Sequence, residues 1–143
     1  MESAYFDPVG IRKSAKRHGL NTDASFRFER GVDPDVTEYA LKYAAKMIID
    51  LAGGEIKGSI YEASFKLPKG AKFILNYNDI YKTVGHEISK EDISKILNGL
   101  EIKIKHSNHD SLEIEIPRYR NDVTRPIDVI EEILRVYGYN NIE

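Results

Sequence analysis

The feature that constrains this fold most is a pair of short segments in which an aliphatic residue alternates with a charged one. Residues 102–105 read Ile-Lys-Ile-Lys, and residues 112–116 read Leu-Glu-Ile-Glu-Ile. A period of two places the apolar side chains on one face of a strand and the charged side chains on the other. The polar run 106–111 between the segments predicts a turn, so together they predict a β-hairpin.

Amphipathic helices are predicted on both sides of this hairpin. A brief helix is expected between Asn76, a candidate cap, and Gly85, and Ser89 with Asp92 resembles a capping box that opens a second helix. A third helix is expected over residues 124–137, where the apolar residues recur at helical spacing. Its core-facing side is predicted to carry Ile127, Ile130, Ile133, Leu134 and Tyr137. With a short strand before the first helix, this order predicts a winged-helix-like module with a two-stranded wing.

The first half of the chain is marked by two Asp-Pro dipeptides, at residues 7–8 and 33–34. Each dipeptide offers a capping aspartate followed by proline at the first helical position, so each predicts a helix start. Glycines close both predicted helices, the first at Gly19. Short strands are predicted at residues 26–28 and 56–65, where apolar and charged residues alternate or β-formers gather.

The Pro-Lys-Gly sequence at residues 68–70 predicts a turn or linker. We therefore expect a boundary there, with a helical segment and short strands in residues 1–67 and the winged-helix-like module in residues 68–143. The predicted fold class is α+β.

Composition and the lack of several motifs exclude some classes of function. A net charge of −2 gives no overall basic excess to release counterions from a nucleic acid, although a local patch is not excluded. The chain has no cysteine, hence no disulfide and no thiolate metal site. No apolar run approaches a membrane span and no signal-peptide pattern is present, so we expect the cytoplasm and no membrane. Neither a glycine-rich phosphate loop nor a nucleophile elbow occurs.

Four acidic residues near the start of the last predicted helix are the sharpest candidate site. Asp128, Glu131 and Glu132 share one helix face, and Asp122 precedes them in the loop. Four carboxylates at one place suit a hard divalent cation such as magnesium. Alternatively, these acids favour the helix dipole and pair with Arg135. Spacing alone favours the second interpretation, because acidic exposed helix faces are common.

A basic cluster on the first predicted helix is a second candidate site. It consists of Arg12, Lys13, Lys16 and Arg17. Such a cluster is able to follow a phosphate backbone, but a solvated helix face is the more frequent explanation.

Two pairs of long motifs carry a resemblance to a known family. Residues 6–20 read Phe-Asp-Pro-Val-Gly-Ile-Arg-Lys-Ser-Ala-Lys-Arg-His-Gly-Leu, and residues 22–34 read Thr-Asp-Ala-Ser-Phe-Arg-Phe-Glu-Arg-Gly-Val-Asp-Pro. Residues 116–123 read Ile-Pro-Arg-Tyr-Arg-Asn-Asp-Val, and residues 128–139 read Asp-Val-Ile-Glu-Glu-Ile-Leu-Arg-Val-Tyr-Gly-Tyr. The first pair resembles the end of the B3/B4 editing domain in bacterial phenylalanine–tRNA ligase beta chains, and the second is similar to the close of their B5 domain. The resemblance implies a fragment lying inside a longer parent chain.

The resemblance also implies roles for particular residues. In that family, acids spaced as Asp122, Asp128, Glu131 and Glu132 hold a magnesium ion shared with the alpha chain, which favours the metal interpretation over the one from spacing alone. The editing pocket, which hydrolyses tyrosine mischarged onto the tRNA, implies three further residues: Glu2, Thr22 and Ala24. Glu2 is expected to recognise the tyrosine hydroxyl, a polar discrimination that editing requires. Most of that cavity lies outside this chain, so no editing by the fragment is expected.

The resemblance further implies that the fragment is a non-catalytic scaffold. In the family's α2β2 enzyme, ATP and phenylalanine are bound by the alpha chain, and nothing in this sequence resembles that catalytic core. The expected partners are therefore the alpha chain and, through the basic helix, tRNA. The alternative is a free-standing winged-helix nucleic-acid-binding module. Its third helix would present acids to the phosphates, which argues against it.

Overall fold

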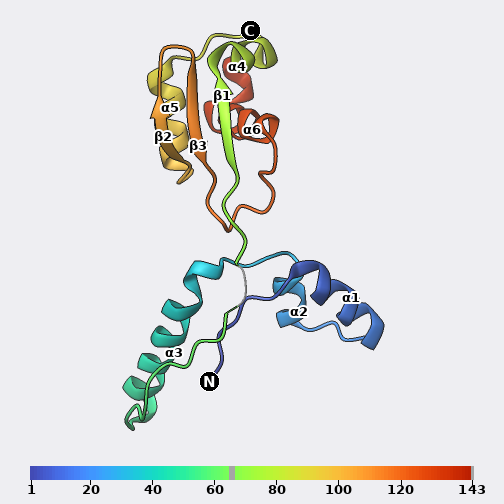
Figure 1. The fold of residues 1–143 in the computed structure, drawn as a ribbon, viewed down its shortest axis with the longest axis vertical. Coiled ribbons are helices and arrows are strands. Elements are labelled where there is room, and N and C mark those ends of the chain that lie inside the picture. Colours follow the sequence, from blue (N-terminus) through green and yellow to red (C-terminus); the bar gives the residue numbers. More distant parts are fainter. Residues whose placement is uncertain (65–66, 143) are drawn as a thin grey trace. The chain divides into compact units, whose positions relative to one another are not determined.

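The computed structural model describes residues 1–64 and 67–142, and the chain divides into two compact units, Met1–Pro68 and Lys69–Glu143 (Figure 1). The first unit contains α1 (Pro8–His18), α2 (Asp23–Phe28), a 3₁₀ turn η1 (Pro34–Val36) and α3 (Thr37–Ala52). The second unit contains β1 (Lys72–Asn76), α4 (Tyr77–Val84), α5 (Lys90–Gly99), β2 (Lys103–Ser107), β3 (Ser111–Glu115), α6 (Pro126–Tyr137) and η2 (Tyr139–Asn141). The α+β class is confirmed. Within the described residues, no helix is both long and apolar enough to span a bilayer.

The sheet of the second unit has three antiparallel strands in the order β1-β3-β2. The predicted hairpin, the two-stranded wing, is confirmed as β2 and β3, and the short strand predicted before the first helix is confirmed as β1. Strand β1 pairs with the free edge of β3, from Lys72 opposite Glu115 to Asn76 opposite Ser111. Alternation along one strand reports which face is buried, but it does not report which segment pairs at its edge.

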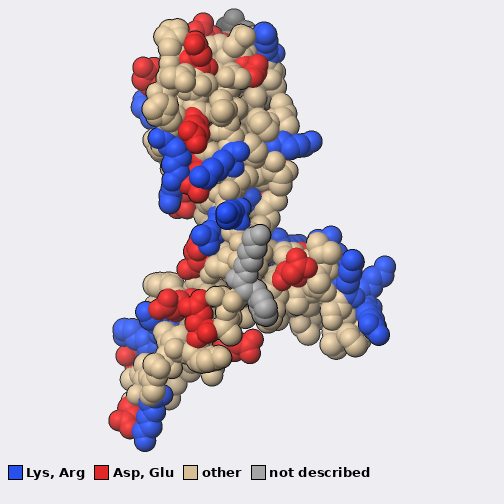
Figure 2. Space-filling view, in the orientation of Figure 1, with Lys and Arg blue, Asp and Glu red and all other residues tan. Residues whose placement is uncertain are grey.

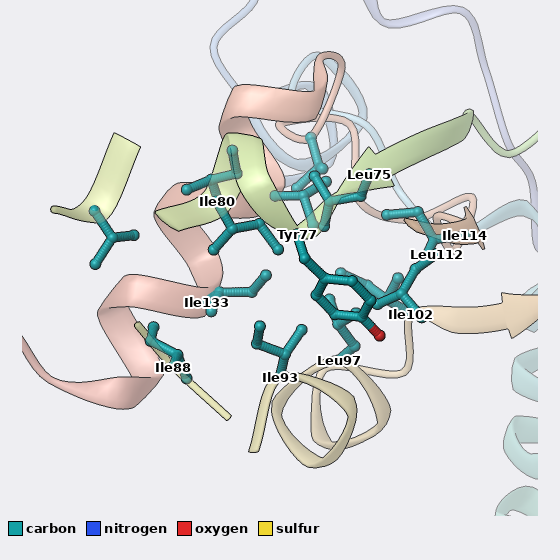
Figure 3. Packing of buried hydrophobic residues seen from close by; sticks show 14 of the residues in the cluster. Leu75, Tyr77, Ile80, Ile88, Ile93, Leu97, Ile102, Leu112, Ile114 and Ile133 are labelled. Carbon is teal, nitrogen blue, oxygen red and sulfur yellow. The ribbon is translucent and has the colours of Figure 1, made fainter. Parts of the chain in front are cut away.

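Among the described residues, the hydrophobic core cluster belongs to the second unit, where α4, α5 and α6 cover one face of the sheet (Figures 1 and 3). The sheet contributes the alternate residues of each strand, so Leu112 and Ile114 are fully buried while Ile74, on the other face, is 67% exposed. The buried residues are Leu75, Tyr77, Ile80, Val84, Ile88, Ile93, Leu97, Ile102, Leu112, Ile114, Ile116, Val123, Val129, Ile130 and Ile133. Dense packing of this kind holds α6 and the loop before it in one position.

The apolar face of α6 differs from the predicted one at its first turn. Val129, Ile130 and Ile133 are buried, whereas Ile127 is 44% exposed, so its predicted core position is wrong. At 100° per residue, Ile127 lies about 110° from the centre of the buried face. The helix therefore turns its first isoleucine toward the solvent and uses Val129 in its place.

The starts of α1 and α5 follow the capping chemistry that the sequence predicts, whereas Asn76 lies at the N-cap of α4 without a side-chain capping hydrogen bond. The carboxylate of Asp7 accepts a hydrogen bond from the Gly10 amide at 2.6 Å, and Gly19 closes α1 at φ +66°. The hydroxyl of Ser89 accepts from the Asp92 amide at 3.1 Å at the start of α5. These bonds satisfy amides that have no partner inside their own helix.

Both strands predicted in the first unit are wrong within the described residues. Residues 26–28 belong to α2, because Thr22 and Ser25 form a reciprocal capping box that starts a helix just before the two phenylalanines. Residues 56–64 form no strand, and Phe65, the last residue of that prediction, lies outside the described residues. A strand needs a pairing edge, and the described part of this unit offers none.

The first unit has almost no interior of its own. Among its described residues only Pro34 is buried, and its apolar contacts are local, such as the edge-to-face pair of Phe6 and Phe28 with ring centroids 5.0 Å apart. Helix α3 ends before Gly53 as predicted, but the predicted start at Asp33-Pro34 forms the 3₁₀ turn η1, and α3 itself begins at Thr37. It leaves its large apolar side chains exposed: Tyr39, Tyr43, Met47, Ile48 and Leu51.

Candidate functional site

The four candidate acids lie on α6 and on the loop that leads into it. Glu131 is exposed, while Glu132 and Asp128 are largely covered, with side chains 15% and 13% exposed. Asp122 lies in the loop and is mostly exposed. Asp128, Glu131 and Glu132 lie on α6 outside its buried face and share one side of the helix, as the spacing predicts.

Asp128 is committed to the start of α6. Its Oδ2 accepts hydrogen bonds from the amides of Thr124 at 3.0 Å and Arg125 at 2.8 Å. Its Oδ1 accepts from Nη2 of Arg125 at 2.7 Å. The hydrogen bond from the Arg125 guanidinium, followed by that from the Thr124 amide, lowers the pKa of Asp128 to about 2. This carboxylate therefore replaces the side-chain cap that Arg125, at the N-cap position, cannot supply.

Asp122 and Glu132 are joined by a residue that the sequence did not single out, Arg120. Its Nε and Nη2 donate to the two carboxylate oxygens of Asp122 at 3.0 and 2.8 Å, a bidentate pair. The same Nη2 lies 3.1 Å from Oε2 of Glu132, which also accepts from Nη2 of Arg135 at 2.6 Å. The predicted pairing of the acidic face with Arg135 is present at Glu132.

The electrostatics follow from this pairing. The hydrogen bond from Arg120 lowers the pKa of Asp122, while that from Arg135, with a further one from Arg120, lowers the pKa of Glu132. Both carboxylates are held charged by guanidinium groups. The Arg120 guanidinium in turn has its pKa raised, chiefly by its hydrogen bond to Asp122.

As arranged, these acids do not fit a magnesium ion. Across residues 1–64 and 67–142, no three histidine, aspartate or glutamate side chains come together as a set that could hold a metal. Three of the four acids direct their oxygens at guanidinium or amide donors, and magnesium demands near-octahedral oxygen ligation. The metal site at Asp122, Asp128, Glu131 and Glu132 stays a prediction, and it requires these pairs to open.

The three predicted editing-pocket residues lie in the first unit. Glu2 is exposed near the start of the chain, and Ala24 is exposed in the first turn of α2. Thr22 is the N-cap of α2, and its hydroxyl accepts from the Ser25 amide at 3.1 Å. The described structure therefore gives Thr22 a local structural role, and the pocket role of all three stays a prediction.

The four basic residues of the predicted tRNA contact lie along α1. Arg12, Lys13, Lys16 and Arg17 are all exposed, and Figure 2 shows lysine and arginine atoms gathered over the α1 region of the first unit. Only Arg12 is tied down among the described contacts, since its Nη2 donates to the backbone oxygen of Glu29 at 3.2 Å. The other three have exposed cationic ends, as either a phosphate contact or a solvated face requires.

In comparisons with known proteins, each of the two units matches a domain family. Residues 73–139 match the tRNA synthetase B5 domain, and residues 1–53 match the B3/4 domain. The phenylalanine–tRNA ligase beta subunit of Bacteroides thetaiotaomicron is 50% identical over 143 residues. This alignment covers 100% of this chain and 17% of that subunit. The chain is homologous to this beta subunit. A second relative, the beta subunit of Yersinia pestis, is 40% identical over 144 residues, covering 99% of this chain and 18% of the relative.

These findings confirm the family resemblance, and this chain spans less than a fifth of the length of these relatives. A crystal structure of an N-terminal fragment of the phenylalanyl-tRNA synthetase beta subunit from Pyrococcus horikoshii aligns with a TM-score of 0.43 and 24% identity. The alignment covers 49% of this chain and 20% of that one. The four acids fall within the B5 match, and Glu2, Thr22, Ala24 and the basic residues of α1 fall within the B3/4 match.

Proposed function

We propose that this chain is a non-catalytic scaffold segment of a phenylalanine–tRNA ligase, which attaches phenylalanine to its tRNA with ATP. The observation that carries this proposal is the contrast between the two units. The second unit has a complete core, whereas the first leaves the apolar side chains of α3 exposed. An apolar helix face of that size is stable in water only when another surface covers it.

The surface that covers α3 is proposed to be the rest of the ligase beta subunit. On α3, the rings of Tyr39 and Tyr43 stack with centroids 6.0 Å apart and are more than half exposed. On another side of the helix, Lys42 forms a solvent-exposed ion pair with Glu38, with Nζ and Oε1 2.6 Å apart. The two faces of α3 therefore support different roles, one toward protein and one toward water.

A matched pair of variants in a full-length beta subunit tests this role. Tyr43→Ser is expected to reduce the yield of folded subunit and of its complex with the alpha chain, while Lys42→Ser leaves both unchanged. In the 143-residue chain alone, neither variant should move the unfolding of the second unit. Equal yields for the two variants in the full-length subunit would contradict the scaffold role of α3.

The same proposal covers three further points: the boundary between the two segments, the partners of the parent enzyme and its ligands. The division near residues 67 and 68 separates the end of the B3/B4 segment from the B5 domain, the alpha chain of an α2β2 enzyme binds ATP, and the complex works in the cytoplasm on tRNA. Magnesium enters only if Asp122, Asp128 and Glu132 leave their present partners, so no step is assigned to it.

Catalytic competence is tested directly on the chain. Purified chain mixed with ATP, phenylalanine and tRNA is expected to give neither pyrophosphate exchange nor charged tRNA. Exchange above a control that lacks the chain, in protein free of host ligase, would overturn the non-catalytic assignment. The nucleic-acid-binding alternative predicts salt-sensitive binding to duplex DNA, and Glu131, exposed on α6, opposes it.

A further inference from the structure

Arg120 occupies the centre of the charged loop before α6. Its side chain is 15% exposed, and it contacts Asp122 through both Nε and Nη2 and Glu132 through Nη2. Arginine presents its donors in a rigid planar fork, so one guanidinium is able to bind two carboxylates at once. Asp122 is in the loop and Glu132 is in the middle of α6, so this one side chain joins the loop to the helix.

Other contacts make the same loop a well-ordered element. The hydroxyl of Tyr119 donates to Oε2 of Glu101 at 2.6 Å, and Asp128 holds the amides of Thr124 and Arg125. Arg120 lies in the chain between Tyr119 and Asp128, and its guanidinium supplies the positive charge that joins Asp122 to Glu132.

We propose that Arg120 is a built-in counter-cation that fixes this loop on α6 and excludes divalent cations from Asp122 and Glu132. A guanidinium and a metal ion repel each other, and both need the same carboxylate oxygens. The sequence spacing of these acids suits metal ligands, yet the described side chains do not converge as a metal-binding set. The contacts of Arg120 explain this difference, because they hold Asp122 and Glu132 on a guanidinium. The affinity of Asp122 and Glu132 for magnesium is therefore set by Arg120, which is not one of the four acids.

The test is a magnesium titration of the complete 143-residue chain followed by the amide NMR signals of residues 117–135. The unmodified chain is expected to show no saturable shifts up to about 10 mM magnesium, beyond the range of weak open sites. Arg120→Gln removes the guanidinium and should bind magnesium at least about tenfold more tightly, with saturable shifts at Asp122 and Glu132. Arg135→Gln is the matched control, because it also removes an arginine from Glu132 but leaves Arg120 in place.

Two results would overturn the proposal. One is saturable magnesium binding at Asp122 and Glu132 in the unmodified chain with the affinity of Arg120→Gln. The other is an equal gain in Arg135→Gln, which would show that charge alone matters. If Arg120→Gln gives no folded spectrum, Arg120→Lys takes its place. A lysine cannot hold both oxygens of Asp122 and reach Glu132, so a severalfold gain in affinity is expected, and an unchanged affinity overturns the proposal.

Discussion

Truncation of Ile133 tests how α6 is seated on the sheet. Its side chain is completely buried in the core of the second unit. Ile133→Ala removes three carbon atoms at about 0.8 kcal/mol each and leaves a cavity. We expect a loss of about 3–4 kcal/mol in the free energy of unfolding. That is a large part of the total for a unit of this size, which general per-residue values place at about 4–11 kcal/mol. The milder Ile133→Val should cost about 0.5–1.5 kcal/mol.

The matched control is Ile127→Ala on the same helix. Ile127 is 44% exposed, so its truncation gives up only part of one side chain's burial, and alanine has the higher helix propensity. A cost below about 1 kcal/mol is expected. Urea unfolding of the complete chain, followed by amide signals of the second unit, measures both variants. Equal losses at the two positions would refute the orientation of α6 in which Ile133 faces the core and Ile127 faces the solvent.

Three further predictions follow from single contacts. Gly70→Ala should destabilise the second unit, as measured by its urea midpoint, because a Cβ there collides with the backbone oxygen of Ile116; a residue in an unconstrained linker would tolerate alanine. The pKa of Asp128 is lowered from 3.8 to about 2, so its contribution to stability is complete above the unfolded value and disappears as pH falls toward 2. The unfolding midpoint of Asp128→Asn should therefore fall less steeply than that of the unmodified chain between pH 4 and about 2. Parallel plots of midpoint against pH would show that protonation of this carboxylate does not affect stability. Thr22→Ala should fray α2, seen as reduced helical Cα shifts at Ser25, whereas Thr22→Ser should preserve them.

Local chemistry determined the helix ends and the hairpin of this chain. The side chains of Asp7 and Ser89 accept hydrogen bonds from backbone amides three residues on, and the amide of Gly19 donates to carbonyls at the end of α1. All of these partners lie within a few residues, so their effect is readable from the sequence. The same locality explains a wrong prediction: the alternation of Phe26 and Phe28 predicts a strand, but the capping box at Thr22 and Ser25 makes the segment a helix. A strand gains stability only from a distant partner, and a cap needs none.

At the candidate site, too, some features follow from the sequence alone and others from the tertiary structure. The sequence by itself determined that Asp128, Glu131 and Glu132 share one face of α6, because helical geometry alone places them there. It also indicated the likeness to phenylalanine–tRNA ligase beta subunits, which the B3/4 match over residues 1–53 and the B5 match over residues 73–139 bear out. Only the tertiary structure decided that β1 adds to the hairpin, that Val129 rather than Ile127 enters the core, and that Arg120 lies between Asp122 and Glu132. These facts depend on how the loop folds back onto α6 and how the helix is rotated against the sheet. Such arrangements arise from packing between segments far apart in the chain, which local periodicity does not encode.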